Sequence, residues 1–380
     1  MEIYLDNAAT SHPKPEEVLI AVRDALTIHN GNPGRSGHAR ALEGGRIVLA
    51  AREALQRLFH LPDPDLIAFC FNCTDALNLA IKGSLHKGDH VIASALEHNS
   101  VLRVLMELQA RELIEVTLVE PDQNGEVPPE KYQGAARPNT RLAILTHASN
   151  VTGVIQPVAA VGGAMREMGI RFLIDGAQAV GHFPVNLSAI PCDLYAFPGH
   201  KGLLAPQGTG GLYIAPDLAL NTLREGGTGS VSNHMRQPTE RPERYESGTA
   251  NLPGIAGLLA GVEFVAKRQQ RIRDEERALT DALIGGLRAM PGITLYTSDD
   301  RAARAGVVSF NVGDLTSSQT ADLLAEREIA VRGGLHCAPG AHQWLGTLAR
   351  GAVRASVGWA TTEEDVEGFL RAIHEIAKGV

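Results

Sequence analysis

The 380-residue chain is poor in features that mark several classes of protein. It has only 4 cysteines, too few for a disulfide framework in a chain of this length, so each is read as a thiol. It has no run of Lys or Arg, and its formal charge of −8 argues against a nucleic-acid partner. No apolar run reaches membrane-spanning length, and the N-terminus lacks a signal-peptide core. We therefore expect a cytoplasmic protein without a membrane partner.

A dinucleotide fingerprint is also missing. The nearest candidate, Gly208-Thr209-Gly210-Gly211, precedes an apolar strand and not a helix, which disfavours a doubly wound nucleotide-binding enzyme. The lone pair Cys70-x-x-Cys73 is more typical of coincidence than of a zinc or redox site, and no metal site is predicted. The sequence shows no internal repeat and no low-complexity tract.

The pattern that is present alternates short apolar runs with helical segments from residue 66 onward. Such alternation predicts an α/β fold whose mainly parallel sheet is covered by helices. After residue 253 two long helices lead into mixed strands and helices, which predicts a smaller α+β domain. We expect a large domain over residues 15–252 and a small domain formed by residues 1–14 and 253–380. The expected strands are 3–5, 66–71, 90–94, 115–119, 141–146, 171–174, 193–197, 211–215, 293–296, 307–312 and 353–357. The expected helices are 15–29, 40–59, 74–86, 100–111, 158–168, 253–270, 272–289 and one that starts at Thr362.

One stretch, from Arg171 to Gly211, offers two groups suited to one cofactor. Asp175 closes one apolar strand, and Lys201 follows the next on a glycine-flanked loop. Carboxyl ends of strands in open α/β sheets face the crevice where ligands bind. An amine that can form a Schiff base, opposite an Asp that can hold a pyridinium nitrogen, is what pyridoxal phosphate requires. A turn-forming Asp and a solvated surface Lys are the plain alternatives.

Three more polar groups follow other expected strands: Thr74, His98 and Asn150. A hydroxyl at the start of a helix suits a phosphate, a His can stack on a ring or shuttle a proton, and an Asn can contact a ligand hydroxyl. Each residue alone is explained as well by helix capping, a satisfied loop His or a turn. Five such groups at one edge of one sheet are harder to attribute to accident.

These motifs resemble the class V aminotransferase group of fold-type I pyridoxal phosphate enzymes, and within it the cysteine desulfurases. The segment Arg332–Ala338, with Cys337, resembles the active-site cysteine motif of the group II branch, which includes selenocysteine lyases. The resemblance implies a fold-type I transferase with a seven-stranded sheet. The other segments that carry it are Tyr4–Thr10, Gly31–His38, Thr74–Ala76, Glu97–His98, Ser149–Gly153, Asp175–Gln178, Gly199–Lys201, Glu246–Thr249 and Arg354–Ser356.

The resemblance also implies roles for individual residues. Lys201 is expected to bond the cofactor aldehyde, Asp175 to pair with the pyridine nitrogen, and His98 to stack on the ring. Arg354 is expected to clamp the substrate carboxylate bidentately, with Asn150, Ala8 and His38 nearby. Further cofactor contacts are expected from Asn150 and Gln178 at the ring oxygen, from Cys73, Thr74 and His200 at the phosphate, and from Thr249 at the phosphate of the other subunit of a homodimer.

Two positions depart from the family's usual pattern. Pro198 and Cys73 stand where a Ser and a Thr often give hydroxyl contacts to the phosphate; Pro cannot donate and a thiol donates weakly. These departures put cofactor affinity, not cofactor identity, in question.

The predicted reaction is desulfuration of L-cysteine to L-alanine, with sulfur carried as a persulfide on Cys337 and passed to an acceptor protein or small thiol. Selenocysteine lyase, another class V enzyme such as an epimerase or aminotransferase, and a non-catalytic cofactor-binding scaffold remain as alternatives. An epimerase or aminotransferase would have no use for Cys337.

Overall fold

A seven-stranded sheet forms the centre of the computed structural model, which describes residues 2–34, 37–230, 233–298, 300 and 303–379. Its strand order is β2-β8-β7-β6-β5-β3-β4. All neighbours from β7 to β4 run parallel, and β8 is antiparallel to both β7 and β2. The expected mainly parallel sheet is therefore confirmed. The strands are β2 (Ile67–Cys70), β3 (Asp89–Ser94), β4 (Ile114–Val119), β5 (Thr140–Thr146), β6 (Arg171–Asp175), β7 (Leu194–Pro198) and β8 (Gly210–Ile214).

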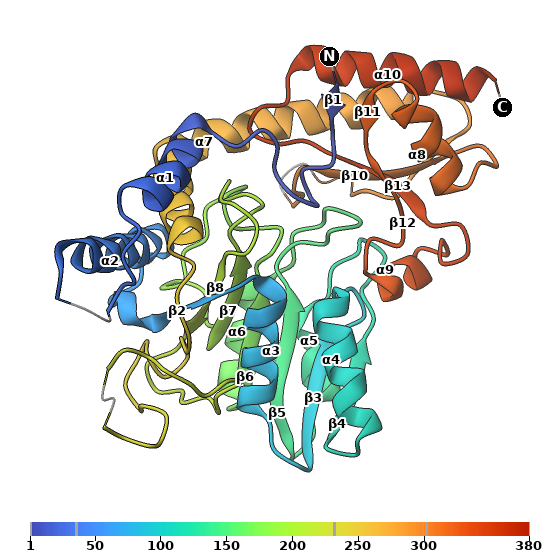
Figure 1. The fold of residues 1–380 in the computed structure, drawn as a ribbon. Coiled ribbons are helices and arrows are strands. Elements are labelled where there is room, and N and C mark those ends of the chain that lie inside the picture. Colours follow the sequence, from blue (N-terminus) through green and yellow to red (C-terminus); the bar gives the residue numbers. More distant parts are fainter. Residues whose placement is uncertain (1, 35–36, 231–232, 299, 301–302, 380) are drawn as a thin grey trace.

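Helices cover this sheet, as expected where strands are buried on both faces. Figure 1 shows α3 and α4 in front of it, with α1 and α2 beside it at the left. The short helix α5 was not predicted from the sequence. These helices are α1 (Glu16–Thr27), α2 (Ala39–Phe59), α3 (Cys73–Ser84), α4 (Asn99–Ala110), α5 (Pro129–Ala135) and α6 (Val158–Glu167), with a 3₁₀ turn η1 (Pro64–Leu66) before β2.

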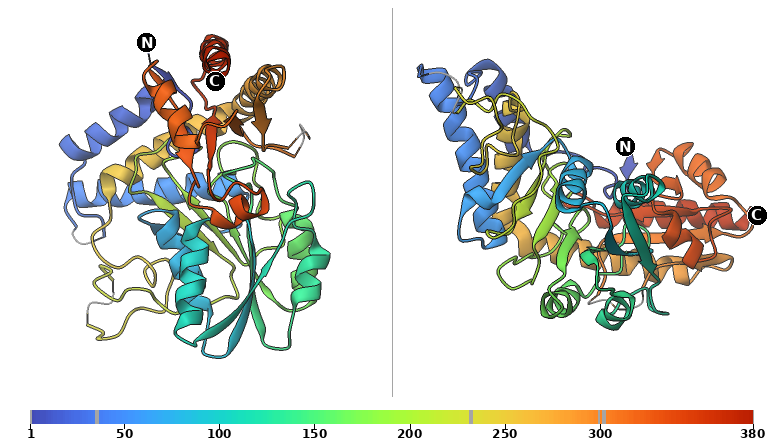
Figure 2. Two further views of the ribbon diagram at one scale, coloured as in Figure 1. Left: turned by 90° about the vertical axis from the view of Figure 1, so that its right-hand side faces the viewer. Right: turned by 90° about the horizontal axis from the view of Figure 1, so that it is seen from below.

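The C-terminal part builds a four-stranded sheet of order β12-β13-β10-β9. The N-terminal strand β1 (Ile3–Tyr4) pairs in parallel with β11 (Ile329–Ala330), far from it in the sequence. Figure 2 shows these orange and red elements gathered on one side of the molecule. Their bounds are β9 (Ile293–Leu295), β10 (Val307–Val312), α8 (Ser317–Ala325), β12 (Arg332–Gly334), α9 (Pro339–Trp344), β13 (Ala352–Ser356) and α10 (Glu363–Lys378).

One long helix, α7 (Leu252–Arg288), replaces the two helices expected over 253–270 and 272–289. The expected break falls among polar residues, but none of them is a Gly or Pro that would interrupt the helix. Side chains four residues apart are bonded across that point: Gln270 to Asp274 at 3.0 Å and Arg271 to Glu275 at 2.7 Å. Such pairs on an exposed face support a continuous helix.

The two largest apolar cores both include residues of α7. Near its start, Leu258 and Val262 pack in the core of the large sheet. Near its end, Leu283 and Leu287 pack with the C-terminal strands and α10. The helix therefore joins the two cores, while the exact domain boundaries stay a prediction.

Among the described residues, no helix is long and apolar enough to cross a membrane.

Two neighbouring glycines in α6 offer a matched test of how the helix packs on the sheet. A Cβ on Gly162 would lie 2.2 Å from the carbonyl oxygen of Pro191, whereas a Cβ on Gly163 would meet nothing within 4 Å. We expect Gly163→Ala to raise the free energy of unfolding by about 0.5–1 kcal/mol through helix propensity. Gly162→Ala should lower it by about 1–3 kcal/mol through overpacking. Urea denaturation of both variants measures this, and equal effects would contradict the packing.

Candidate active site

A cavity of about 220 Å³ opens at the carboxyl ends of β2, β3, β5, β6 and β7. The C-terminal sheet and the N-terminal segment close it from the other side. Parallel strands end at the same edge, so one edge of the sheet collects side chains that are far apart in sequence. The predicted site residues that line this cavity are Ala8, Cys73, Thr74, His98, Asn150, Asp175, Gln178, His200, Lys201 and Arg354.

Asp175 and Lys201 are placed by β6 and β7. Asp175 is the last residue of β6 and is paired in register with Ala196 of β7, so the loop that carries Lys201 starts beside it. The carboxylate is 3 % exposed and accepts a bond from the backbone N–H of Ala177 at 2.9 Å. Burial lowers the pKa of the Lys201 amine, although Asp175 acts in the opposite direction. Within the described residues this amine makes no hydrogen bond or ion pair, which leaves it available to a ligand.

His98 stands at the N-cap of α4. Its Nδ1 accepts a bond from the backbone N–H of Ser100 at 3.0 Å, so the proton of the neutral ring is on Nε2. Burial lowers the pKa of His98, which favours the neutral form, although Asp175 acts against this. The cap fixes the ring at the pocket wall.

The start of α3 differs in detail from the expectation. Asn72, not Thr74, is the N-cap, since its side chain accepts from the N–H of Asp75 at 2.9 Å. The hydroxyl of Thr74 instead lies 2.7 Å from that of Ser100 on α4. Thr74 thus remains in the pocket wall at the helix N-terminus, where backbone N–H groups favour an anion.

The N-terminal segment holds the turn before Lys201, a feature that sequence reasoning missed. The carbonyl oxygen of His200 accepts from the hydroxyls of Thr10 and Ser11, both at 3.1 Å, and from the amine of Lys14 at 2.9 Å. Burial lowers the pKa of Lys14 to about 8. Polar residues in Asp6–Lys14 suggest no such contact by themselves, because the partner lies about 190 residues away in the chain.

Two arginines face the pocket from the C-terminal sheet. Arg332 on β12 and Arg354 on β13 are direct cross-strand partners, an arrangement that like charges disfavour. Arg354 is 1 % exposed, lies 2.8 Å from the carboxylate of Asp6, and has a buried Nε without a partner in the described part of the chain. Burial lowers the pKa of Arg354, with Asp6 opposing. The guanidinium groups of Arg332 and Arg354 carry two positive charges against the one negative charge of Asp6, so a second anion is electrostatically favourable there.

Cys337 follows β12 on a loop that the pocket residues hold. The amide of Asn150 donates to the carbonyl of His336 at 2.7 Å, and the N–H of Asn99 donates to that of Cys337 at 2.6 Å. Both His336 and Cys337 have left-handed backbone conformations, with φ of 49° and 57°. Non-glycine residues in this region carry strain of order 1–3 kcal/mol each, which is typical of functional sites. The Cys337 sulfur lies 3.9 Å from a guanidinium nitrogen of Arg332.

The other three cysteines are held as thiols by burial. Burial raises the pKa of Cys192 to about 12, and that of Cys70 well above its ordinary value. Cys73 lines the pocket, but its sulfur lies 3.5 Å from Asp175, and burial together with this carboxylate raises its pKa strongly. Of the cysteines near the pocket, Cys337 is the one beside a cation instead of an anion.

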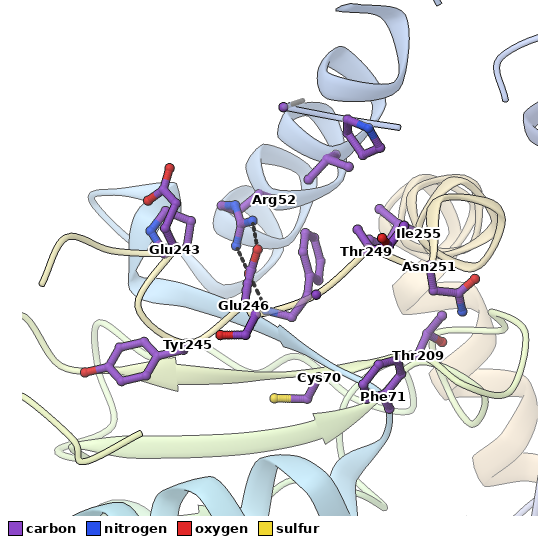
Figure 3. Close-up of a pocket in the computed structure, with 18 of the residues that line it drawn as sticks. Arg52, Cys70, Phe71, Thr209, Glu243, Tyr245, Glu246, Thr249, Asn251 and Ile255 are labelled. Carbon is purple, nitrogen blue, oxygen red and sulfur yellow. Dashed lines mark hydrogen bonds and ion pairs between the residues drawn. The ribbon is translucent and has the colours of Figure 1, made fainter. Parts of the chain in front are cut away.

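Two predicted site residues lie elsewhere in this chain. His38 is exposed and caps α2 by accepting from the N–H of Ala41 at 3.2 Å. Thr249 lines a second hollow of about 250 Å³, shown in Figure 3. There Arg52 and Glu246 point toward each other at 2.8 Å. A contact of Thr249 with another subunit stays a prediction.

Comparison with known proteins gives matches along the whole chain. The family described as aminotransferase class V matches residues 3–369. A probable cysteine desulfurase of Methanothermobacter thermautotrophicus is 33% identical, over 99% of this chain and 94% of the relative. One of Pyrococcus abyssi is 34% identical, over 100% and 95%. The apo structure of a cysteine desulfurase from Thermococcus onnurineus aligns with a TM-score of 0.94 at 31% identity, covering 100% of this chain and 95% of the other.

Glu97, directly before His98, is a buried carboxyl under the pocket. Oε1 accepts from the hydroxyl of Ser94 at 2.6 Å and from the N–H of Thr146 at 2.7 Å, while Oε2 has no partner among the described residues. Burial raises the pKa of Glu97 from 4.5 to about 8. The folded protein therefore keeps a proton that the unfolded chain releases. The stabilisation is full below pH 4.5 and is lost as the pH rises through about 8.

We expect Glu97→Gln to flatten the pH dependence of stability. In the unmodified protein this carboxyl lowers the free energy of unfolding by up to about 1.4 kcal/mol per pH unit between the two pKa values. The amide cannot titrate and keeps the acceptor oxygen, so the variant should lack this slope. Denaturation at several pH values measures it, with Glu130→Gln, an exposed position, as control. A slope unchanged in Glu97→Gln would contradict the assignment.

Proposed function

The chain belongs to the aminotransferase class V family, and we propose that it is a pyridoxal phosphate-dependent cysteine desulfurase. It converts L-cysteine to L-alanine and transfers the sulfur. The observation that carries this proposal is one pocket that holds Lys201, Asp175 and Arg354, with Cys337 on the adjoining loop. Full-length relatives named as cysteine desulfurases support it.

The residues present fit pyridoxal phosphate. Lys201 is a partly buried amine that has no partner among the described residues, and its pKa is lowered, so it is suited to bond an aldehyde. Asp175 is a buried carboxylate suited to hold a pyridinium proton, and His98 offers the face of a neutral ring. The N-terminus of α3, with Thr74 and His200, would hold the phosphate. When bound, the cofactor supplies an electron sink for the carbon beside the reacting amine.

Residues of the chain then orient and deprotonate the substrate. Arg354 would bind the L-cysteine carboxylate. A further anion is favourable there because the Nε of Arg354 has no partner among the described residues and because Arg332 lies on the neighbouring strand. Asn150 and Gln178 border the same space, Gln178 being fixed by its bond to the carbonyl of Ala8 at 3.0 Å. The Lys201 amine, once free, is the base that removes the proton from the substrate's α carbon and returns it.

Cys337 takes the sulfur. Its thiolate attacks the substrate sulfur, an S–S bond forms and the C–S bond breaks. The carbon fragment keeps the electron pair of that bond, takes up a proton and leaves as L-alanine. The persulfide on Cys337 passes its outer sulfur to an acceptor protein or small thiol. The guanidinium of Arg332 lies 3.9 Å from the Cys337 sulfur.

The phosphate contacts depart from the usual pattern, as the sequence indicates. Pro198 ends β7 in the pocket wall without an N–H, and the thiol of Cys73 points to Asp175. The phosphate must therefore depend on α3 backbone N–H groups, Thr74, His200 and a second subunit.

We expect Cys337→Ser to keep cofactor absorbance but to lower sulfide and alanine formation from L-cysteine by at least about 100-fold, because the other thiol in the pocket, Cys73, faces Asp175 and is held protonated. Cys192→Ser, at a buried thiol outside the pocket, is the control and should retain activity. Alanine and sulfide release after incubation with L-cysteine measure both. A Cys337→Ser enzyme at the normal rate would falsify the persulfide role; a rate much higher with L-selenocysteine would instead indicate a lyase.

A homodimer completes the proposed site. Large exposed apolar side chains gather on α1 and α2, with Leu19, Leu26, Leu42 and Leu49 each at least half exposed. Apolar faces of this kind mark interfaces. A second copy on this side would bring its own pocket toward the Figure 3 hollow, where Thr249 stands. The sulfur-acceptor protein and the cytoplasmic location stay predictions.

Mixing two inactive variants tests whether Thr249 serves the other subunit. Thr249→Asp would repel the phosphate, and Lys201→Ala removes the amine. If Thr249 acts across the interface, refolding the two together should restore about a quarter of the activity, in mixed dimers with one intact site. Activity that stays at the sum of the separate variants would mean that Thr249 acts within its own chain or not at all.

A further inference from the structure

A small cavity of about 30 Å³ lies beside α7, away from the residues used above. One wall is a single face of α7, with residues spaced three or four apart. The opposite wall is the turn after β6 and the segment that leads into β10. The polar side chains that line it are His182, Arg273, Glu276, Arg277, Thr280 and Arg304.

Positive charge dominates this cavity. Arg273 and Arg277 make no hydrogen bond or ion pair with any other described residue. Arg304 is paired with Asp281, which does not line the cavity. The one carboxylate in the lining, Glu276, already accepts from Nδ1 of His182 at 3.0 Å.

Three buried side-chain nitrogens of the lining residues have no partner among the described residues. They are Nε of Arg277, Nε of Arg304 and Nε2 of His182. Burial lowers the pKa of His182, but the Glu276 carboxylate outweighs it, so the pKa is raised. Buried donors without acceptors are rare in folded proteins because each loses its hydration. One water accepts two bonds at most and neutralises no charge.

We propose that this cavity is a binding site for a small inorganic oxyanion, with phosphate or sulfate as the chemical class. Such an ion accepts several N–H bonds at once and neutralises the unpaired guanidinium groups. Ala305 and Gly306 also line the cavity, so a single methyl group is the only side chain at these two positions. The ion would tie α7 to the two segments opposite.

The site also adjoins the catalytic lysine. A Cβ on Gly202, the residue after Lys201, would lie 3.0 Å from Nε2 of His182. The imidazole thus packs on the lysine loop, and an anion that fixes His182 would stiffen that loop from behind. This is a stabilising site, independent of the desulfurase reaction.

Thermal unfolding of the holoenzyme tests the proposal, because the bound cofactor already fills the phosphate position of the active site. At constant ionic strength set with sodium chloride, saturating sodium phosphate should raise Tm by roughly 2–4 °C. Arg277→Met and Arg273→Met should each remove this rise and weaken phosphate binding at least about tenfold in calorimetry. Arg271→Met, on the exposed face of the same helix and paired with Glu275, is the control and should keep both.

The change in stability caused by Arg277→Met, with and without phosphate, distinguishes anion binding from a purely structural role. In phosphate-free buffer Arg277→Met should be as stable as the unmodified protein or more so, because it removes an unsatisfied buried donor. In phosphate it should be less stable. Equal destabilisation in both buffers, or no phosphate-dependent Tm shift in the unmodified holoenzyme, overturns the proposal.

Discussion

The structure depends most on two opposite charges held at the ends of neighbouring buried strands. Asp175 closes β6, and β7 leads directly to Lys201. Because β6 and β7 pair in parallel and are buried on both faces, a shift in their register would move one charge away from the other. Gly176 shows how little freedom remains: a Cβ there would lie 2.1 Å from the Tyr195 ring. The pairing of β6 with β7 thus holds the Asp175 carboxylate beside the loop of Lys201 before any ligand binds.

The sequence predicted this part of the molecule well for a physical reason. Buried parallel strands are continuous apolar runs, and each run ends where a polar residue reaches the crevice. The observed strands of the large sheet accordingly differ from the expected ones by at most one residue at either end. The long helix α7 was harder, since exposed polar residues at 269–271 resemble a break when their i,i+4 partners are not considered. The short strands β11 and β12 have too few residues for a pattern.

The features of the site that could not be predicted from the sequence are contacts between segments far apart in the chain. The pairing of Arg332 opposite Arg354 depends on a register between two short strands, one of which ends in Gly333-Gly334. The hydrogen bonds from Thr10 and Lys14 to the carbonyl oxygen of His200 join the N-terminal segment to the lysine loop. Neither follows from local spacing, because tertiary packing alone brings the partners together. The motif Arg332–Ala338 could be recognised in the sequence, but the position of Arg332 in the pocket wall could not.

The four cysteines show why position decides chemistry in this fold. A thiolate is the reactive form of cysteine, and it is favoured by nearby positive charge and disfavoured by burial or a carboxylate. Cys73 is inside the pocket yet faces Asp175, so its charged form would repel the carboxylate that we propose to hold the cofactor. Cys337 follows β12 of the C-terminal sheet and lies beside Arg332, on a loop tied to the pocket through Asn150. In the proposed mechanism the large sheet therefore supplies no competing nucleophile, and sulfur transfer needs the C-terminal sheet to be packed against the pocket.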